Sequence, residues 1–344
     1  MSDHINIPIF IPHLGCPNCC VFCNQRTISG VHSFDLASVG SIIEEHIASS
    51  PGKEREVAFF GGSFTGIDKD LMISLLEIAC QFVKKGDIIG IRCSTRPDYI
   101  DEEIISILKK YGVKTVELGI QSVSEHVLLT SKRGHSFETT KRACALITQS
   151  GIELVGQMMI GLPGSSIDDE IDTARFIVNS GAIGARVYPT VVFKNTELCQ
   201  MTFSGEYTPL TVDEAVQRSA AVCKIFFENQ INVLRIGLCS SESVLDDNNY
   251  HDGPMHPALG ELVENEIYYD IIKQKIHSLR NTNDACLTVF IPKGTASKAI
   301  GQRKKNKIRL MNEFGFRELR FVEDDSIKAF DEISVQERKR TECT

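Results

Sequence analysis

The feature of this 344-residue chain that most constrains its fold is a regular alternation over its first two thirds. Short apolar runs with the length of buried strands cover residues 5–14, 56–60, 88–93, 115–120, 153–160, 185–192 and 231–238. Helical spacing covers residues 35–49, 71–84, 101–111, 139–150, 167–179 and 212–229. Six or seven strand and helix units predict parallel strands with right-handed crossovers. The predicted fold class is therefore α/β, either a partial or complete barrel or a doubly wound sheet.

Glycine and polar motifs follow the ends of the predicted strands. They are residues 16–23, 61–63, 94–96, 121–122, 161–164 and 188–189. The carboxyl ends of parallel strands meet at one rim, which is where barrel enzymes carry their active sites. Strand termination by Gly and Pro is the alternative explanation, but it does not account for Arg96, Gln121 and Tyr188 at the same places.

One loop concentrates cysteine. Cys16, Cys20 and Cys23 have the spacing C-x3-C-x2-C, and Cys19 lies outside it. A structural zinc site normally uses four ligands, often as two distant C-x2-C pairs, and no second pair follows here. Three thiolates on one loop suit an iron-sulfur cubane in which one iron has no protein ligand. A structural zinc knuckle and a disulfide pair remain the alternatives.

This spacing, with the aromatic Phe22 just before the last cysteine, resembles the motif of the radical S-adenosylmethionine (SAM) enzymes. The resemblance implies a 4Fe-4S cluster held by Cys16, Cys20 and Cys23, whose open iron binds SAM. It implies reductive cleavage of SAM to methionine and a 5'-deoxyadenosyl radical, with an electron donor such as ferredoxin or flavodoxin. It also favours a partial (β/α)6 TIM-type barrel among the folds above.

The same resemblance assigns cofactor-binding roles. Gly61 and Gly62 occupy the place of a family Gly-Gly-Glu motif, and Ser63 replaces its acidic residue. Arg96 is expected to pair with the cofactor carboxylate through its planar fork. The ribose hydroxyls are assigned to Glu117 and Gln121, for which an internal hydrogen-bond layer without a ligand is the alternative. The full predicted cofactor set is Phe22, Gly61, Gly62, Ser63, Ser94, Arg96, Glu117, Gln121 and Tyr188.

Four further motifs indicate a subgroup within this family; they lie at residues 93–99, 116–122, 133–135 and 187–190. Together they resemble the radical domain of the catalytic subunit of the Elongator complex and its prokaryotic relatives, over residues 7–238. That subunit continues into an acetyltransferase domain, for which this sequence has no expected counterpart. Within the third motif, His135 is assigned either a catalytic role or capping of the next helix beside Ser136.

The pattern changes after the last apolar run. We predict the barrel over residues 1–240, a linking loop and helix over 241–285, a basic module over 286–330 and a flexible tail over 331–344. The last three make a small α+β carboxyl-terminal extension.

Residues 293–309 carry seven Lys or Arg and no acidic residue. Around Gly301 this run resembles the Gly-x-x-Gly turn of a KH module, with Lys304 at the second glycine. A solvated basic helix is the alternative. The predicted nucleic-acid contacts are Lys298, Gly301, Arg303, Lys304, Lys305 and Lys307.

Composition limits the function. A formal net charge of −8 argues against a uniformly basic protein but allows a local basic patch. The sequence shows no secretory signal and no apolar stretch long enough for a membrane span, which predicts a cytoplasmic protein without a membrane partner. The leading hypothesis is a radical SAM enzyme that modifies RNA, with a tRNA base as substrate. The alternatives are a radical SAM enzyme for a small metabolite or porphyrin, and an RNA-binding protein without catalysis.

Overall fold

The computed structural model describes residues 4–11, 16, 20–24, 34–238, 249–279, 285–328 and 332–338. The chain forms two compact units. Unit 1 comprises residues 1–215 and 225–255, and unit 2 comprises residues 216–224 and 256–344. In the ranges that the structure describes, no helix combines the length and the apolar character that a membrane crossing requires.

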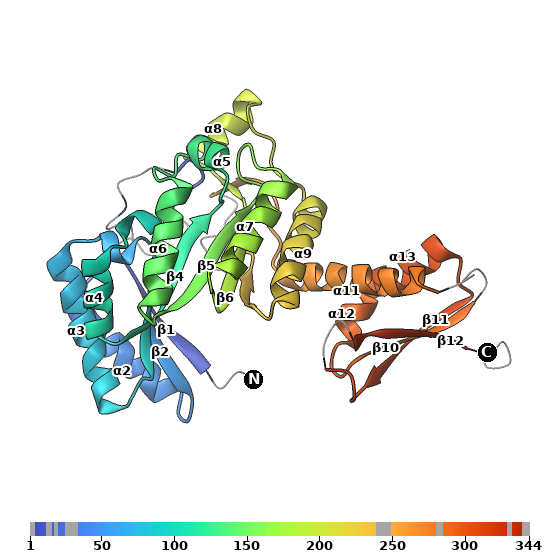
Figure 1. Cartoon of the computed structure of the whole chain (residues 1–344), viewed down its shortest axis with the longest axis horizontal. Helices are drawn as coiled ribbons and strands as arrows, with labels where there is room; N and C mark the ends of the chain where they lie inside the picture. The colour runs from blue at the N-terminus through green and yellow to red at the C-terminus, as the bar shows by residue number, and fades with distance from the viewer. Residues whose placement is uncertain are drawn as a thin grey trace. The chain divides into compact units, whose positions relative to one another are not determined.

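Unit 1 is built on a seven-stranded parallel sheet in the order β1-β2-β3-β4-β5-β6-β8 (Figure 1). The strands are β1 (His4–Phe10), β2 (Glu54–Phe60), β3 (Gly90–Thr95), β4 (Val113–Gln121), β5 (Glu153–Ile160), β6 (Gly184–Pro189) and β8 (Asn232–Ile236). The order follows the chain without reversal, whereas a doubly wound sheet reverses at a switch point. The predicted α/β partial barrel is therefore confirmed, and the doubly wound alternative is wrong.

One layer of helices covers the outer face of this sheet (Figure 1). The helices of this layer are α2 (Val39–Ser49), α3 (Lys69–Lys85), α4 (Glu102–Lys110), α6 (Phe137–Gln149) and α7 (Ile167–Asn179). Helix α9 (Val212–Glu228) precedes β8 in the chain, and its residues 216–224 belong to unit 2. Short polar side chains begin several of these helices, as the backbone N–H groups of a first turn require. Asp101, for example, accepts a hydrogen bond from the Ile104 N–H at 2.8 Å.

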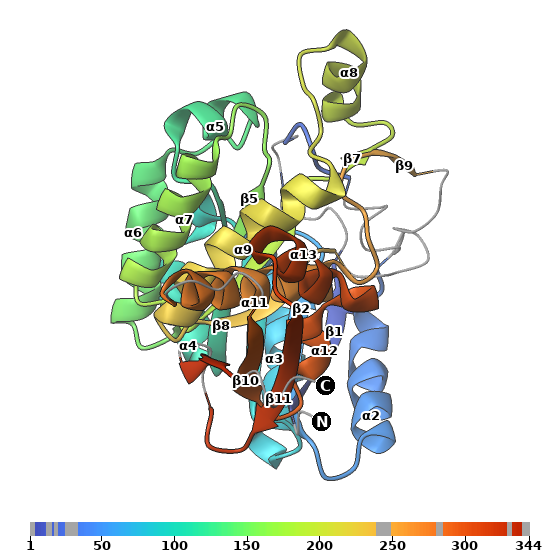
Figure 2. The ribbon, with the colours of Figure 1, turned by 90° about the vertical axis from the view of Figure 1, so that its right-hand side faces the viewer.

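Short elements lie at the carboxyl ends of the strands. They are η1 (Leu36–Ser38), η2 (Phe64–Gly66), η3 (Pro97–Tyr99), α5 (Glu125–Thr130), α8 (Glu197–Ser204), β7 (Val192–Phe193) and β9 (Tyr250–Asp252). The pair β7 and β9 is antiparallel, and α8 packs against β7 (Figure 2). They place extra chain over the rim where an active site is expected.

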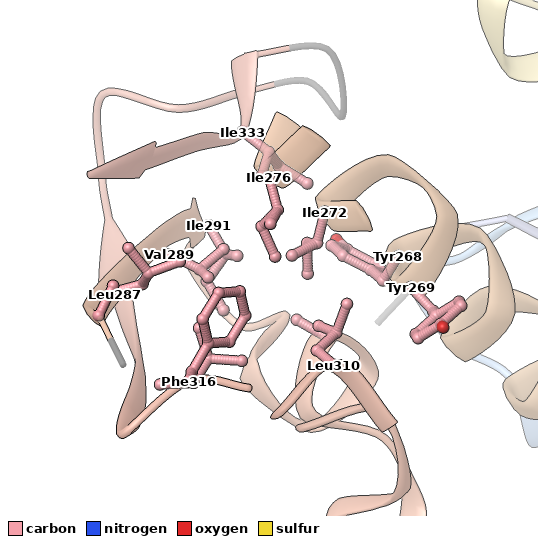
Figure 3. Close-up of a cluster of buried hydrophobic side chains, with 13 residues drawn as sticks. Tyr268, Tyr269, Ile272, Ile276, Leu287, Val289, Ile291, Leu310, Phe316 and Ile333 are labelled. Atoms are coloured by element: carbon pink, nitrogen blue, oxygen red, sulfur yellow. The ribbon is translucent and has the colours of Figure 1, made fainter. Parts of the chain in front are cut away.

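Unit 2 has its own hydrophobic core (Figure 3). Its elements are α11 (Leu259–His277), β10 (Cys286–Pro292), α12 (Ala296–Ile300), η4 (Gln302–Lys304), α13 (Lys305–Phe314), β11 (Glu318–Asp324) and β12 (Ser334–Glu337). The sheet order is β11-β10-β12, in which β10 and β11 are parallel and β10 and β12 antiparallel. Leu310 of α13, Ile272 of α11 and Val289 of β10 are fully buried in one cluster.

Two features of unit 2 differ from the predicted boundaries. Helix α11, assigned to a linking segment, contributes Tyr268, Ile272 and Ile276 to the same core as the basic module. The segment 331–344, assigned to a flexible tail, contains β12, which pairs with β10. The four-residue strand escaped sequence analysis because only Val335 in it is apolar, and that residue packs against the core.

Candidate active site

A cavity of about 600 Å³ lies within unit 1, on the inner side of the curved sheet. Every strand of the seven-stranded sheet contributes to its lining, together with the cysteine loop (residues 16–23) and residues after the strand ends. Seven of the nine predicted cofactor residues line it: Phe22, Gly61, Gly62, Ser94, Glu117, Gln121 and Tyr188. Ser63 and Arg96 are buried but do not line the cavity.

The cysteine loop is attached to two outer segments. The Val21 N–H donates to the Ser131 carbonyl at 3.2 Å, and the Leu198 N–H donates to the Val21 carbonyl at 2.8 Å. A turn in which the Cys23 N–H donates to the Cys20 carbonyl at 3.0 Å brings the last two cysteines together. Cys20 is buried, whereas Cys23 faces the cavity. Cys19 lies outside the described residues.

The three cysteines of the motif are thiols and not half-cystines. Within the described ranges, no three Cys, His, Asp or Glu side chains are arranged closely enough to hold a metal ion. Three cysteine thiols are nevertheless the right kind of ligand for an iron-sulfur cluster, which binds thiolates. Two guanidinium groups face the sulfur of Cys20. Arg133 Nη1 lies 3.4 Å and Arg96 Nη1 lies 3.7 Å from its sulfur. Such cations stabilise a thiolate.

Arg96 follows the end of β3, as sequence analysis predicted, and its guanidinium is held by protein groups. Its Nε and Nη2 each lie 2.9 Å from a carboxylate oxygen of Asp98, and Nη2 also donates to the Arg133 carbonyl. The guanidinium fork is thus occupied inside the protein, and its remaining nitrogen faces Cys20. The geometry favours a role in holding the cysteine loop over the predicted pairing with a cofactor carboxylate.

The carboxylate of Glu117 is also fully hydrogen-bonded to other protein groups. It is completely buried, and its two oxygens accept four hydrogen bonds, from Arg92, from both ends of the Arg186 fork and from Gln157, at 2.7–3.0 Å. Burial alone raises the pKa of Glu117, but the hydrogen bonds and charges of Arg186 and Arg92 outweigh it and lower the pKa. A carboxylate with four donors has no oxygen left for a ribose, so the internal hydrogen-bond layer is the better description.

Glu117 belongs to a chain of charges across four strands. Glu56 accepts from Arg92 at 2.8 Å, Arg92 donates to Glu117, and Glu117 accepts from Arg186. We call these four residues the ion-pair chain. Sequence analysis missed Arg92 and Arg186, although both had a signal: each is a charged residue inside an otherwise apolar strand, where an unpaired charge is costly.

Gln121 is the predicted cofactor residue whose geometry best suits a ligand. Its φ is +66°, a backbone conformation that residues with side chains rarely adopt. The strand pairing between β4 and β5 is irregular at this point, between Gly119 and Gln121. The side chain lines the cavity, and its buried Oε1 has no hydrogen-bond partner in the described part of the protein. Strain and an unsatisfied acceptor together mark a site built for a ligand.

Gly61 is needed for a close approach. Its φ is +96°, and a Cβ there would lie 3.3 Å from the Ile11 backbone nitrogen. The Ile11 N–H donates to the Phe60 carbonyl at 2.8 Å, just before the cysteine loop. A bare backbone at Gly61 thus allows the end of β2 to lie against Ile11, the residue that follows β1.

His135 does not cap the following helix. Ser136 does so, by accepting a hydrogen bond from the Thr139 N–H at 3.3 Å. Burial, followed by the charge of Arg133, lowers the pKa of His135 to about 4, so the ring is neutral at pH 7.

In unit 2, the predicted nucleic-acid residues lie around a tight turn between α12 and α13. We call residues 301–305 the basic turn. The Lys304 N–H donates to the Gly301 carbonyl at 2.9 Å, and Arg303 and Lys304 have φ of +50° and +63°. The left-handed backbone at Lys304 explains why glycine stands there in a Gly-x-x-Gly turn.

The six predicted basic-module residues have different surroundings. Arg303, Lys304 and Lys305 are exposed. Lys298 is paired with Glu264 at 2.9 Å, and Lys307 is half-buried. Gly301 is buried, and a Cβ on it would lie 3.0 Å from the Asn306 backbone nitrogen. The accessible positive charge is therefore that of the basic turn.

The family of the chain follows from this site and from comparison with known proteins. A family model described as the radical SAM superfamily matches residues 10–177, and one described as the radical SAM carboxyl-terminal domain matches residues 183–269. The chain belongs to the radical SAM superfamily and is a radical SAM enzyme. Members of this family bind a 4Fe-4S cluster and SAM.

Two of the relatives are a tRNA acetyltransferase and an Elongator subunit. The tRNA uridine(34) acetyltransferase of Methanocaldococcus infernus is 39% identical over 128 residues, which are 36% of this chain and 24% of that protein. Elongator complex protein 3 of Homo sapiens is 31% identical over 137 residues, 39% of this chain and 25% of that protein. The matched part is about a quarter of the length of these relatives.

Among solved structures, the archaeal Elp3 of M. infernus with an amino-terminal deletion (1–46) has a TM-score of 0.63. It is 24% identical to this chain, and the match covers 80% of this chain and 64% of that one. This likeness confirms the fold, including the partial barrel.

Proposed function

We propose that this radical SAM enzyme modifies RNA, with a base of tRNA as its substrate. The observation that carries the proposal is the likeness of its barrel to tRNA uridine(34) acetyltransferase. The exposed basic turn supports it independently, because a positively charged loop binds phosphates whatever the sequence of the RNA. Arg303, Lys304 and Lys305 are the proposed RNA contacts, with Gly301 shaping the turn and with Lys298 and Lys307 at its flanks.

We assign the cluster to Cys16, Cys20 and Cys23, and SAM to the cavity beside them. When bound there, the cluster and SAM would supply the radical chemistry of the family. The protein has the tasks of binding, orientation and exclusion of water. Arg133 and Arg96 stabilise the Cys20 thiolate, and Gln121 Oε1 accepts a hydrogen bond from a SAM hydroxyl.

The remaining assignments concern the cofactor surroundings and the partners. Gly61 and Gly62 present bare backbone to the ligand, and Phe22, Ser94 and Tyr188 complete its surroundings, with Ser63 buried next to Gly62. We assign reduction of the cluster to ferredoxin or flavodoxin in the cytoplasm.

Anaerobic reconstitution tests this function. The protein is loaded with iron and sulfide, reduced with dithionite and incubated with SAM and bulk tRNA. We expect 5'-deoxyadenosine together with a mass shift in one tRNA nucleoside, and both signals should vanish in Cys20→Ala. Cleavage of SAM without any nucleoside change, and with turnover of a porphyrin or another small molecule, would overturn the assignment of RNA as substrate.

The basic turn is tested separately by tRNA binding at increasing salt. The triple variant Arg303→Ala, Lys304→Ala, Lys305→Ala should bind tRNA more weakly and with a shallower salt dependence, by a slope of about one for each charge removed. Lys53→Ala, Lys84→Ala, Lys109→Ala removes the same charge from exposed helix and turn positions of unit 1 and is the matched control. Equal losses in both triples would contradict a specific role of the turn.

A further inference from the structure

Arg133 is a buried cation beside the cysteine loop. It is 5% exposed, and its Nη1 lies 3.4 Å from the sulfur of Cys20, which is itself 5% exposed. Nη2 donates to the Gly119 carbonyl of β4 at 2.7 Å, and the Arg133 backbone N–H donates to the Leu128 carbonyl at 2.9 Å. The guanidinium therefore has a fixed position against this sulfur.

The charge of Arg133 has no counter-charge in the described part of the protein. No carboxylate there lies within ion-pair distance of its guanidinium, and its buried Nε has no hydrogen-bond partner. A cation that is buried without a partner is costly. An anionic group bound at the cysteine loop would supply the missing partner.

Arg96 faces the same sulfur but has a different net charge around it. Its Nη1 lies 3.7 Å from the sulfur of Cys20, while its Nε and Nη2 each lie 2.9 Å from an oxygen of Asp98. The Asp98 carboxylate cancels most of the positive charge that Arg96 brings to the site. Of the two guanidinium groups that face Cys20, that of Arg133 is therefore the uncompensated one.

An uncompensated cation at this sulfur affects the two oxidation states of a bound cluster differently. Reduction adds one electron, and so one negative charge, to the cluster; the donor loses that electron, and no bond is made or broken. Hydrogen bonds to sulfur, net charge and burial set the reduction potential of such clusters. In a buried site a nearby charge is screened only weakly, so the cation stabilises the reduced form more than the oxidised form.

We propose that Arg133 raises the reduction potential of the cluster through Cys20, and that Asp98 limits the same effect of Arg96. Arg133 thereby favours transfer of the electron from ferredoxin or flavodoxin. It is a positioning residue, because it acts through the sulfur and does not contact the substrate. This inference rests on the proposed assignment of the cluster to the cysteine loop and is independent of RNA as the substrate.

A redox titration of the reconstituted full-length protein, followed by electron paramagnetic resonance, tests the proposal. The wild type and each variant are compared at equal iron per chain. In Arg133→Met, the ratio of reduced to oxidised cluster at a fixed solution potential should fall about tenfold, which moves the midpoint by about 59 mV to more negative values. Arg133→Lys keeps the charge and should restore most of this ratio. Lys132→Gln removes the same charge from an exposed ion pair with Glu197 and should leave the midpoint unchanged.

The pair formed by Arg96 and Asp98 provides a second test that leaves Arg133 in place. Arg96→Gln leaves the Asp98 carboxylate uncompensated, so the midpoint should become more negative. The double variant Arg96→Gln, Asp98→Asn has the net charge of the wild type and should recover most of the loss. A further disruption of the loop would not restore the potential, whereas removal of a negative charge would.

The outcomes distinguish this inference from the cluster assignment. Equal midpoints in Arg133→Met and the wild type would overturn the inference, as would an equal shift in Lys132→Gln. If Arg133→Met binds no iron, the Arg96 variants decide, and equal midpoints in the single and the double variant would overturn the inference. A wild-type protein that binds no reducible cluster would instead overturn the assignment of the cluster to the cysteine loop.

Discussion

Glu117 shows what a single buried residue does in this barrel. It joins Arg92 and Arg186 of two other strands, and no oxygen of its carboxylate is left without a donor. A charge pair of this kind stabilises a protein little compared with an apolar pair, but breaking it leaves an uncompensated charge. Its contribution to the enzyme is therefore a fixed geometry of the cavity wall.

We predict that Glu117→Gln lowers the free energy of unfolding by about 3–5 kcal/mol at pH 7, because the two guanidinium groups lose their shared carboxylate. Urea unfolding measures this. Glu103→Gln, which removes a carboxylate from an exposed pair with Lys69, is the control and should have no measurable effect. Equal stabilities of Glu117→Gln and the wild type would show that the ion-pair chain is not maintained.

The stability difference between the wild type and Glu117→Gln should also depend on pH. Because the pKa of Glu117 is lowered on folding, its contribution is fully present above the unfolded value of about 4.3 and is lost as pH falls through the folded value. The difference between wild type and Glu117→Gln should hold from pH 7 to about pH 5 and shrink only below about pH 4. A decline already complete at pH 5 would mean a raised pKa.

Gln121 combines a strained backbone with a side chain that we assign to SAM binding, so a substitution should affect stability and binding differently. We expect Gln121→Gly to leave the free energy of unfolding within about 1 kcal/mol of the wild type, since relief of the positive φ offsets the greater freedom of glycine in the unfolded chain. SAM affinity of the reconstituted enzyme, measured by equilibrium dialysis, should fall about tenfold with the lost acceptor. Gln230→Gly, at φ +58° on the surface, makes the same backbone change and should keep full affinity.

At the scale of elements, the end of β2 contacts the chain that follows β1 at Gly61 and Ile11. We predict that Gly61→Ala costs about 1–3 kcal/mol and lowers the iron bound per chain after reconstitution, because its methyl group pushes on Ile11. Gly52→Ala is the matched control: its φ is +74°, and no atom lies within 4 Å of the added methyl group. If both variants bind iron equally well, the close approach at Gly61 has no part in shaping the loop.

The basic turn gives a second prediction at this scale. Lys304→Gly and Lys304→Ala remove the same charge, but only glycine suits a φ of +63°. We expect the glycine variant to be more stable than the alanine variant by about 1 kcal/mol, and both to lose tRNA affinity to the same degree. Thermal unfolding and a tRNA titration measure the two quantities. A larger loss of tRNA affinity in the alanine variant would mean that the shape of the turn matters more than its charge.

Sequence analysis predicted elements better than contacts. The strands and helices could be predicted because the periodicity of apolar residues is a local property of the sequence. The cysteine loop could be predicted because the spacing of its cysteines is local too. The partners of Glu117 were not, because which strands face one another across the curved sheet depends on closure of the whole sheet. The ion pair of Arg96 was not predicted either, because nothing in the motif shows that Asp98, two residues later, pairs with its guanidinium.

At the scale of the molecule, the chain consists of two units with separate cores. We predict that Leu310→Ala destabilises unit 2 by about 2–5 kcal/mol, because it leaves a cavity at a fully buried position. Hydrogen exchange should then increase in peptides from residues 285–328 and stay unchanged in those from residues 113–121. Leu118→Ala, equally buried in β4, should give the reverse pattern. Parallel loss of protection throughout the chain in both variants would show a single cooperative unit.

The open sheet of unit 1 has a consequence for the size of the substrate that can reach the cavity. A closed ring of strands can be entered only through its mouth, so one monomer of a polymer has to be flipped out of the polymer to reach the lumen. A ring left unjoined between its first and last strands can receive one monomer sideways, while the rest of the polymer stays outside, uncut on either side.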